Sequence, residues 1–177
     1  MISFPRGKTA TSSTSPPVSL KDIIWTWIGS FLGIFAVYFL HESRLAGSDL
    51  VWIIGSFGAS AVLLFAASDS PLAQPRNMLG GHFLSALVGV SCWLLLAAHP
   101  ALAGALAVSL AISLMQITRM VHPPGGATAL IAVIGSDQVH NLGYLYALVP
   151  VLSGAIIMLV IALITHHLSG RKYPLSW

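Results

Sequence analysis

The sequence predicts an all-α protein: a polytopic transmembrane helical bundle, an inverted repeat of 3+3 segments in which two segments are broken half-helices. Three observations predict this fold. Of the 177 residues, 56% are hydrophobic and 7% are charged, which is outside the range of soluble domains. Four apolar segments are long enough to cross a bilayer as helices. The chain also matches itself at an offset of 68 residues.

Composition also limits the possible functions. The formal net charge is +3, but the Lys and Arg residues are dispersed among short loops and the two ends, so no basic face for nucleic acid is expected. Cys92 is the single cysteine, which excludes a disulfide framework and zinc-type spacing. Residues 1–20 are rich in Ser, Thr and Pro and are expected to form a disordered cytoplasmic tail. A single transmembrane domain follows over 21–177.

Four segments are predicted to span the membrane as continuous helices, because each has 18 or more residues free of Asp, Glu, Lys and Arg. In order along the chain they are 23–40, 78–98, 101–118 and 142–165. Two further apolar segments, 50–68 and 120–136, carry small or helix-breaking residues in their first half. A helix is therefore expected to begin midway in each of them.

The self-match indicates an internal repeat. Residues 58–61 (GASA) align with 126–129 (GATA), and 68–69 (SD) with 136–137, giving units of approximately 21–98 and 99–170. A unit with three crossings must be inserted the second time in the opposite orientation, as in many secondary transporters. With six crossings and both termini cytoplasmic, one side carries Arg6, Lys8, Lys21, Arg76, Arg119, Arg171 and Lys172 and the other only Arg44. If the broken segments re-enter instead, the division is five against three.

The stretch VHPPGGATAL at 121–130 indicates what a broken segment could do. Two prolines prevent a helix from running through and favour a first helical turn, and two glycines allow a close turn of the backbone. In the inverted arrangement, two half-helix starts would face each other near the membrane midplane. Helix starts present unpaired N–H groups and a positive dipole end, so the gap is expected to bind a small anion. The expected substrate-binding residues are Gly58, Ala59, Ser60, His122, Pro123, Pro124, Gly125, Gly126, Ala127 and Thr128. The alternative is a kinked structural helix packed through small residues.

Several other polar residues are candidates for the pathway. Asp69 and Asp137 follow the ends of the two half-helices, where the helix dipole disfavours a negative charge. A gate or ion pair is therefore expected among Arg44, Asp69, Arg76, Arg119 and Asp137, the alternatives being solvated loop charges or a cap of the next helix. His82 is an ionisable residue inside a spanning segment, which makes it a possible pathway residue.

The stretch HPPGGATAL is the signature from which the HPP family of integral membrane proteins takes its name, and this chain resembles that family. SFGASAVLLFA, SPLAQPRNMLGGH and RKYPLSW support the resemblance, which covers roughly 21–177. Members in chloroplasts and cyanobacteria are associated with nitrite transport, so the resemblance implies transport of nitrite or a similar anion. The family is usually described with four transmembrane helices, whereas six segments are counted here.

The sequence thus predicts a transporter or channel for a small monovalent anion, most simply nitrite, and not an enzyme. No cofactor and no metal are expected, and His122 could couple protons to anion uptake. The other expected features are a homo-oligomeric assembly, a bacterial inner membrane and cytoplasmic termini. The alternative is a non-transporting structural or sensory membrane module.

Overall fold

The computed structural model describes the backbone of residues 18–41 and 48–177, and the side chains of 18–40 and 55–177. These residues form helices joined by turns, with no strand among them. The elements are α1 (Leu20–His41), α2 (Ser48–Ala61), the π-helix η1 (Val62–Ala66), the 3₁₀ helix η2 (Pro71–Ala73), α3 (Pro75–Leu96), α4 (Pro100–Ile117), α5 (Pro124–Ile134), α6 (Asp137–Leu142), the π-helix η3 (Ala147–Leu152) and α7 (Ser153–Ser169). Most of the expected N-terminal tail, residues 1–17, lies outside the described part of the chain.

The four expected spans are confirmed as helices that are long and apolar enough to cross a membrane: Leu20–Leu40, Pro75–Leu96, Pro100–Ile117 and Ala147–Ser169. Two of them begin at proline because Pro75 and Pro100 occupy the first helical turn, where the missing N–H is not needed. The last span starts later than predicted. A turn at Gly143, with φ of 50°, ends α6 and precedes η3.

The two broken segments turn out differently. In the second, Met120 to His122 are not helical and α5 begins at Pro124, which confirms a short helix starting inside the segment. In the first, the prediction of a helix start at Gly58 is wrong, because α2 runs from Ser48 through Gly58 to Ala61 and η1 continues it. The reason is the absence of proline there: Gly and Ser weaken a helix, whereas two consecutive prolines interrupt it.

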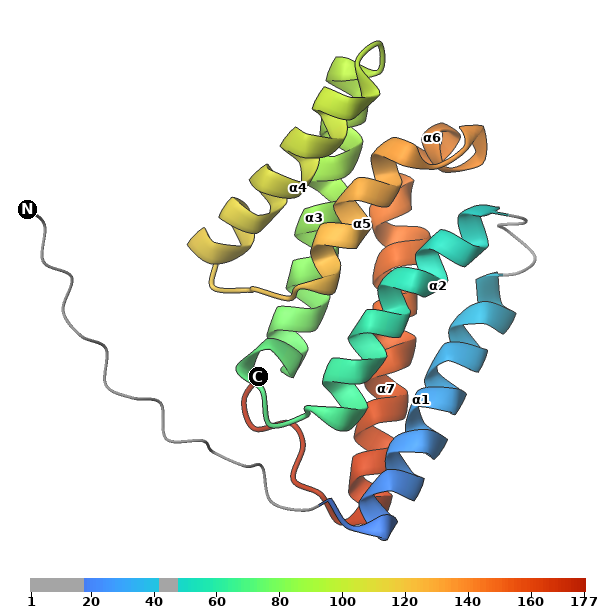
Figure 1. Ribbon diagram of the computed structural model, residues 1–177, viewed down its shortest axis with the longest axis vertical. Coiled ribbons are helices and arrows are strands. Elements are labelled where there is room, and N and C mark those ends of the chain that lie inside the picture. The colour runs from blue at the N-terminus through green and yellow to red at the C-terminus, as the bar shows by residue number, and fades with distance from the viewer. Residues whose placement is uncertain (1–17, 42–47) are drawn as a thin grey trace, which may run out of the picture.

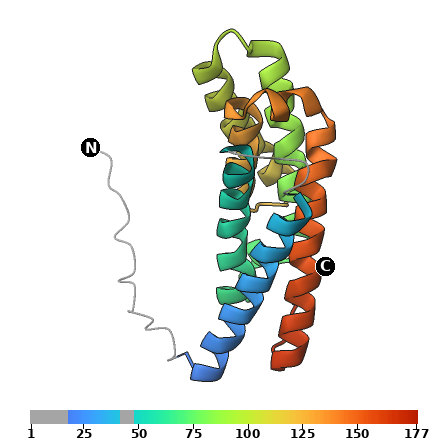
Figure 2. The same cartoon turned by 90° about the vertical axis from the view of Figure 1, so that its right-hand side faces the viewer.

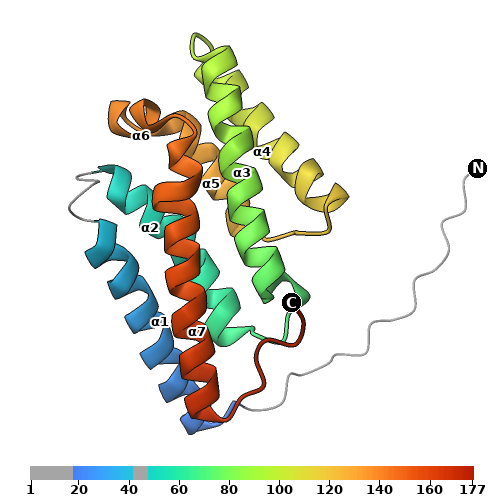
Figure 3. The same ribbon diagram turned by 180° about the vertical axis from the view of Figure 1, so that it is seen from behind.

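Successive long helices alternate in direction. In Figure 1, α1, α3 and α5 run upward, and α2, α4 and α7 run downward. Figure 3 shows α7 lying between α1 and α3, and in Figure 2 the start of α1 and the end of α7 both lie at the bottom of the bundle. The N-terminal end of α1 and the C-terminal end of α7 therefore lie at the same end of the bundle. The stacked Trp27, Phe31 and Phe35 rings on the exposed face of α1 present an apolar surface outward.

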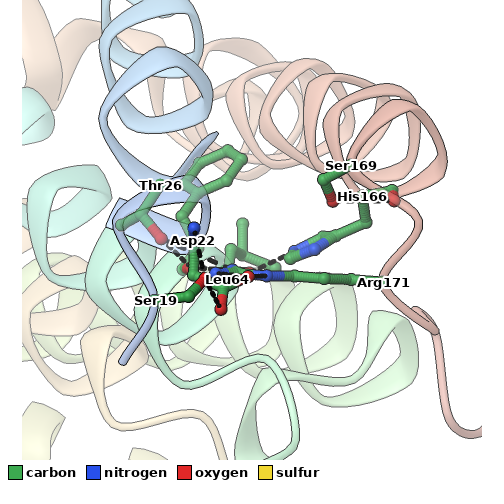
Figure 4. Close-up of polar contacts among 8 residues, drawn as sticks. Ser19, Asp22, Thr26, Leu64, His166, Ser169 and Arg171 are labelled. Atoms are coloured by element: carbon green, nitrogen blue, oxygen red, sulfur yellow. Dashed lines mark hydrogen bonds and ion pairs between the residues drawn. The ribbon is translucent and has the colours of Figure 1, made fainter. Parts of the chain in front are cut away.

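At the lower end of the bundle, Arg171, which follows α7, connects α7 to α1 and η1. Its guanidinium contacts Asp22 of α1 at 2.9 Å and donates to the Phe65 carbonyl of η1 at 3.1 Å. Thr26 donates to the same carbonyl at 2.9 Å, and His166 bonds the Leu64 carbonyl at 2.7 Å. Leu64 and Phe65 lie at the end of the π-helix, where backbone carbonyls have no helical N–H partner. These side chains supply the missing donors. Figure 4 shows the Arg171 side chain reaching from the end of α7 to Asp22 and Thr26 of α1.

Candidate functional site

The centre of the molecule holds a buried polar cluster of Ser56, Ser60, His82, His122 and Thr128. The exposed fractions of these residues are 4%, 0%, 0%, 0% and 2%. Ser56 and Ser60 come from α2, His82 from α3, and Thr128 from α5. His122 comes from the non-helical segment that precedes α5. A cluster of this kind inside apolar spans is costly to bury, so each polar group needs a partner.

Hydrogen bonds link all five side chains. The Ser60 hydroxyl lies 2.8 Å from Nε2 of His82 and 2.9 Å from Nε2 of His122. Nδ1 of His82 lies 2.8 Å from the Thr128 hydroxyl, which lies 2.9 Å from the Ser56 hydroxyl. The two imidazole centroids are 4.8 Å apart. Ser60 and Thr128, matched by the internal repeat, therefore bond opposite sides of one histidine ring.

Close contact between α3 and the start of α5 makes this geometry possible. A Cβ atom on Gly125 would lie 2.7 Å from the Ser85 hydroxyl oxygen and 2.9 Å from the Gly81 carbonyl oxygen. A Cβ on Gly81 would in turn lie 2.5 Å from Cβ of His122. Gly81 and Gly125 are thus needed for the close approach of the α3 backbone to the start of α5.

A second support comes from the loop between η1 and α3. Nδ1 of His122 bonds the Leu72 carbonyl at 2.9 Å. Gln74 in the same loop accepts from the Leu175 N–H at 2.8 Å, and the Tyr173 hydroxyl donates to the Ala73 carbonyl at 2.8 Å. Burial raises the pKa of Tyr173, so its hydroxyl remains a donor at neutral pH. The C-terminal segment thus holds the loop that positions His122.

The structure brings together only part of the predicted binding set. Ser60, His122, Pro124, Gly125 and Thr128 are buried at or beside the cluster, whereas Gly58, Ala59, Pro123, Gly126 and Ala127 are partly or fully exposed on other faces. The 3.6-residue helical period explains this division, since neighbouring residues in a helix point in different directions.

The expectation of two opposed helix starts is wrong. On the α2 side, residues 58–60 lie inside a helix rather than at its start. At the start of α5, the Gly125 and Gly126 N–H groups donate to the His122 and Pro123 carbonyls at 2.8 and 3.0 Å, and Pro124 has no N–H. Side-chain hydroxyls and imidazoles, rather than free backbone N–H groups, are the polar groups that the structure gathers here.

Among the predicted gate residues that the structure describes, none is paired with another. In the part of the chain that the structure describes, the one ion pair joins Arg171 and Asp22. Arg76 instead donates to the Thr118 carbonyl at 3.1 Å. Asp137 is the first residue of α6, where the helix dipole favours a negative charge, and the cap of this helix is the side chain of Ser136, which accepts from the Gln138 N–H. Arg44 lies outside the described residues, and Asp69 and Arg119 occupy turns at the ends of η1 and α4.

Two important partners were not identified from the sequence. Ser56 donates to the Pro124 carbonyl at 3.1 Å and contacts Thr128. At the offset of 68 residues Ser56 falls on Pro124, and this position was the available signal that related the two. The Leu72 carbonyl could not be identified from the sequence, because every residue has a backbone carbonyl and the residue type does not show which one accepts a hydrogen bond. His166, which was not singled out from the sequence, is buried and bonds the Leu64 carbonyl of η1.

The apolar spans and the buried cluster define an integral membrane protein with a group of polar side chains enclosed inside the helical bundle. The chain belongs to the family described as HPP, transmembrane region, whose model matches residues 15–174. The characteristic stretches of that resemblance meet in space, since the cluster contains Ser60, His82 and His122, and its loop is bonded by the C-terminal segment.

Two related proteins of the amoeba Dictyostelium discoideum are described as transmembrane proteins. One is 48% identical over 167 residues, covering 92% of this chain and 58% of the relative. The other is 47% identical over 162 residues, covering 89% of this chain and 52% of the relative. The chain therefore spans little more than half the length of these relatives. No solved structure matches it.

Proposed function

We propose that this protein transports a small monovalent anion, nitrite by its family resemblance, through the junction of α2, α3 and α5. One observation carries the proposal: five hydroxyl and imidazole side chains are buried together where the two repeated motifs meet. In a protein with apolar spans, polar and ionisable groups at such a depth are costly and typically mark substrate or ion pathways.

The chemistry of the cluster suits an anion. Hydroxyl groups and imidazole N–H groups donate hydrogen bonds, and these five side chains come from four separate segments of the chain. In the described arrangement the donors bond one another, as at the 2.8 Å contact between Ser60 and His82. The proposal is that an anion replaces some of these bonds in an alternating-access cycle, with no covalent bond made or broken.

Anion flux tests this proposal. Thr128→Val removes the hydroxyl that joins His82 to Ser56 while keeping a similar volume, and we expect it to reduce nitrite uptake into proteoliposomes about tenfold, as for the loss of a charge-assisted hydrogen bond. Thr165→Val is the matched control, because that buried hydroxyl bonds only carbonyls of its own helix. Absence of nitrite, nitrate, formate and chloride flux in the wild type would instead favour a structural or sensory module.

We also propose six crossings, arranged as an inverted 3+3 repeat, with both ends cytoplasmic in a bacterial inner membrane and several copies assembled together. The alternating helix directions support the six crossings. In this arrangement the segment after η1 faces the cytoplasm and α6 faces the other side.

Cysteine labelling tests this topology. In a Cys92→Ala background, Ala67→Cys and Gln138→Cys place single thiols at exposed positions after η1 and in α6. A membrane-impermeant maleimide is expected to label them from opposite sides of the membrane. Labelling of both from one side would contradict the six crossings.

A further inference from the structure

The directions of the hydrogen bonds that link His122, Ser60, His82 and Thr128 follow from one carbonyl. The Leu72 carbonyl can only accept, so Nδ1 of a neutral His122 carries its proton and Nε2 is bare. Bare Nε2 accepts from the Ser60 hydroxyl, whose only proton is then used. Nε2 of His82 must therefore donate to Ser60, which leaves Nδ1 of a neutral His82 to accept from Thr128. The two histidines hold opposite tautomers.

The cluster also contains the acceptors needed for one additional proton. If Nδ1 of His82 becomes protonated, it donates to Thr128, and the Thr128 and Ser56 hydroxyls must turn elsewhere. The Pro124 carbonyl lies 3.1 Å from the Ser56 hydroxyl and 3.4 Å from the Thr128 hydroxyl. The hydroxyl chain can therefore reverse without leaving a group unpaired. A network that served packing alone would need only one of these two arrangements.

We propose that His82 and His122 bind one proton and exchange it through Ser60, so that the anion crosses together with a proton. In the exchange, the Nε2–H bond of His82 and the O–H bond of Ser60 break. A new O–H bond forms on Ser60 and a new Nε2–H bond forms on His122. One positive charge moves from one ring to the other, and no electron is transferred. The proton comes from water when the cluster opens. This inference rests on the proposed anion transport.

The surroundings of the two imidazole rings favour the binding of an anion and a proton together, with no net charge. Phe57 packs on His82 with ring centroids 5.1 Å apart, and the Tyr146 hydroxyl donates to the Thr128 carbonyl at 3.1 Å. Among the side chains that the structure describes, no Asp, Glu, Lys or Arg is hydrogen-bonded to the cluster. Arg76 donates instead to the Thr118 carbonyl, at the other end of the segment that carries His122. A bound anion and one imidazolium cancel in charge, which lowers the cost of moving either through an apolar interior.

The Leu72 carbonyl also sets a limit to the exchange. A carbonyl oxygen cannot pass a proton on, so a proton that reaches His122 can only return through Ser60 and cannot leave past Leu72 until the cluster rearranges. This arrangement suits a carrier that loads and releases a proton once per cycle, rather than a channel that conducts protons continuously.

Flux measurements in proteoliposomes separate coupled transport from anion transport alone. One nitrite moving with one proton carries no net charge. We therefore expect nitrite uptake by the wild type to follow an imposed pH gradient and to be insensitive to a potassium–valinomycin membrane potential. Protein-free liposomes report the background from permeating nitrous acid. Nitrite flux that follows the membrane potential without proton uptake overturns the coupling and leaves the proposed transport standing, whereas no protein-dependent nitrite flux overturns both.

The variant Ser60→Ala tests the exchange itself. It removes the only hydroxyl between the two rings, and we expect nitrite-dependent proton uptake to fall about a hundredfold, the lower range for a positioned proton-transfer group. Ser85→Ala is the matched control, because Ser85 is a fully buried serine of α3 whose hydroxyl contacts Met115 sulfur at 3.7 Å and lies outside the chain of bonds. Equal proton uptake in the two variants would overturn the role of Ser60.

A spectroscopic measurement reports the two tautomers in the wild type itself. In protein labelled with ¹⁵N-histidine, we expect His122 as the Nδ1–H tautomer and His82 as the Nε2–H tautomer, each assigned by its His→Gln variant. The same tautomer on both rings would contradict the proposed direction of the hydrogen bonds and overturn the exchange.

Discussion

Replacement of Gly125 by alanine is expected to destabilise the protein by about 1–3 kcal/mol, the range for an added group in a well-packed interior. The new Cβ would lie 2.7 Å from the Ser85 hydroxyl oxygen and 2.9 Å from the Gly81 carbonyl oxygen. A backbone carbonyl cannot rotate away as a flexible side chain can, so α5 must move away from α3. The measurement is thermal unfolding of the purified protein in detergent.

The same displacement is expected to reduce transport, because it separates His82 on α3 from Thr128 on α5, which are 2.8 Å apart. The neighbouring Gly126→Ala is the control, since its Cβ would meet only Val108 at 3.9 Å, an ordinary contact. Alanine also favours a helix over glycine, so this variant is expected to be at least as stable as the wild type. Equal unfolding temperatures for the two variants would show that the close approach at Gly125 does not matter for stability.

The variant His82→Leu is expected to abolish nitrite transport and to cost about 2 kcal/mol of stability, because buried polar groups lose their partner. Ser60 and Thr128 bond the two ring nitrogens at 2.8 Å each, and leucine fills a similar volume without bonding either hydroxyl. The two measurements are unfolding in detergent and nitrite uptake by proteoliposomes with matched protein content.

His167→Leu provides the comparison, because this histidine is exposed near the end of α7 and is expected to tolerate the change. Unchanged nitrite uptake in a folded His82→Leu protein would place the transport pathway elsewhere. Reduced stability with unchanged uptake would assign the buried polar cluster to packing alone.

Much of the fold could be predicted from local sequence. The four spans follow from long apolar segments free of charged residues, and α5 follows from Pro123 and Pro124, because two consecutive prolines are tolerated at a helix start and not in a regular helix interior. The continuity of α2 through Gly58 could not be predicted in the same way. Glycine weakens a helix by only about 1 kcal/mol, so packing against neighbouring helices decides whether the helix continues.

The candidate site was predicted in part. The prediction and the structure differ in which side chains point toward one another. The self-match of the sequence aligned Ser60 with Thr128, and these two residues meet at His82. The expected ion pairs of Asp69 with Arg76 or Arg119 did not follow, since proximity along the chain says little about where long side chains point. Arg171 and Asp22, at opposite ends of the described chain, form the pair instead.

The sequence by itself determined that this is an all-helical membrane protein of the HPP family, with a proline-initiated short helix and a polar motif repeated in two halves. These properties follow from composition, from segment length and from the backbone restriction of proline, all of which are local. Only the tertiary structure decided which polar groups are partners. Ser56, Ser60, His82, His122 and Thr128 meet because α2, α3 and α5 cross, and the Leu72 carbonyl sets the direction of their hydrogen bonds. Hydrogen bonds depend on distance and direction in space, and residues far apart in the chain acquire these only when the helices pack.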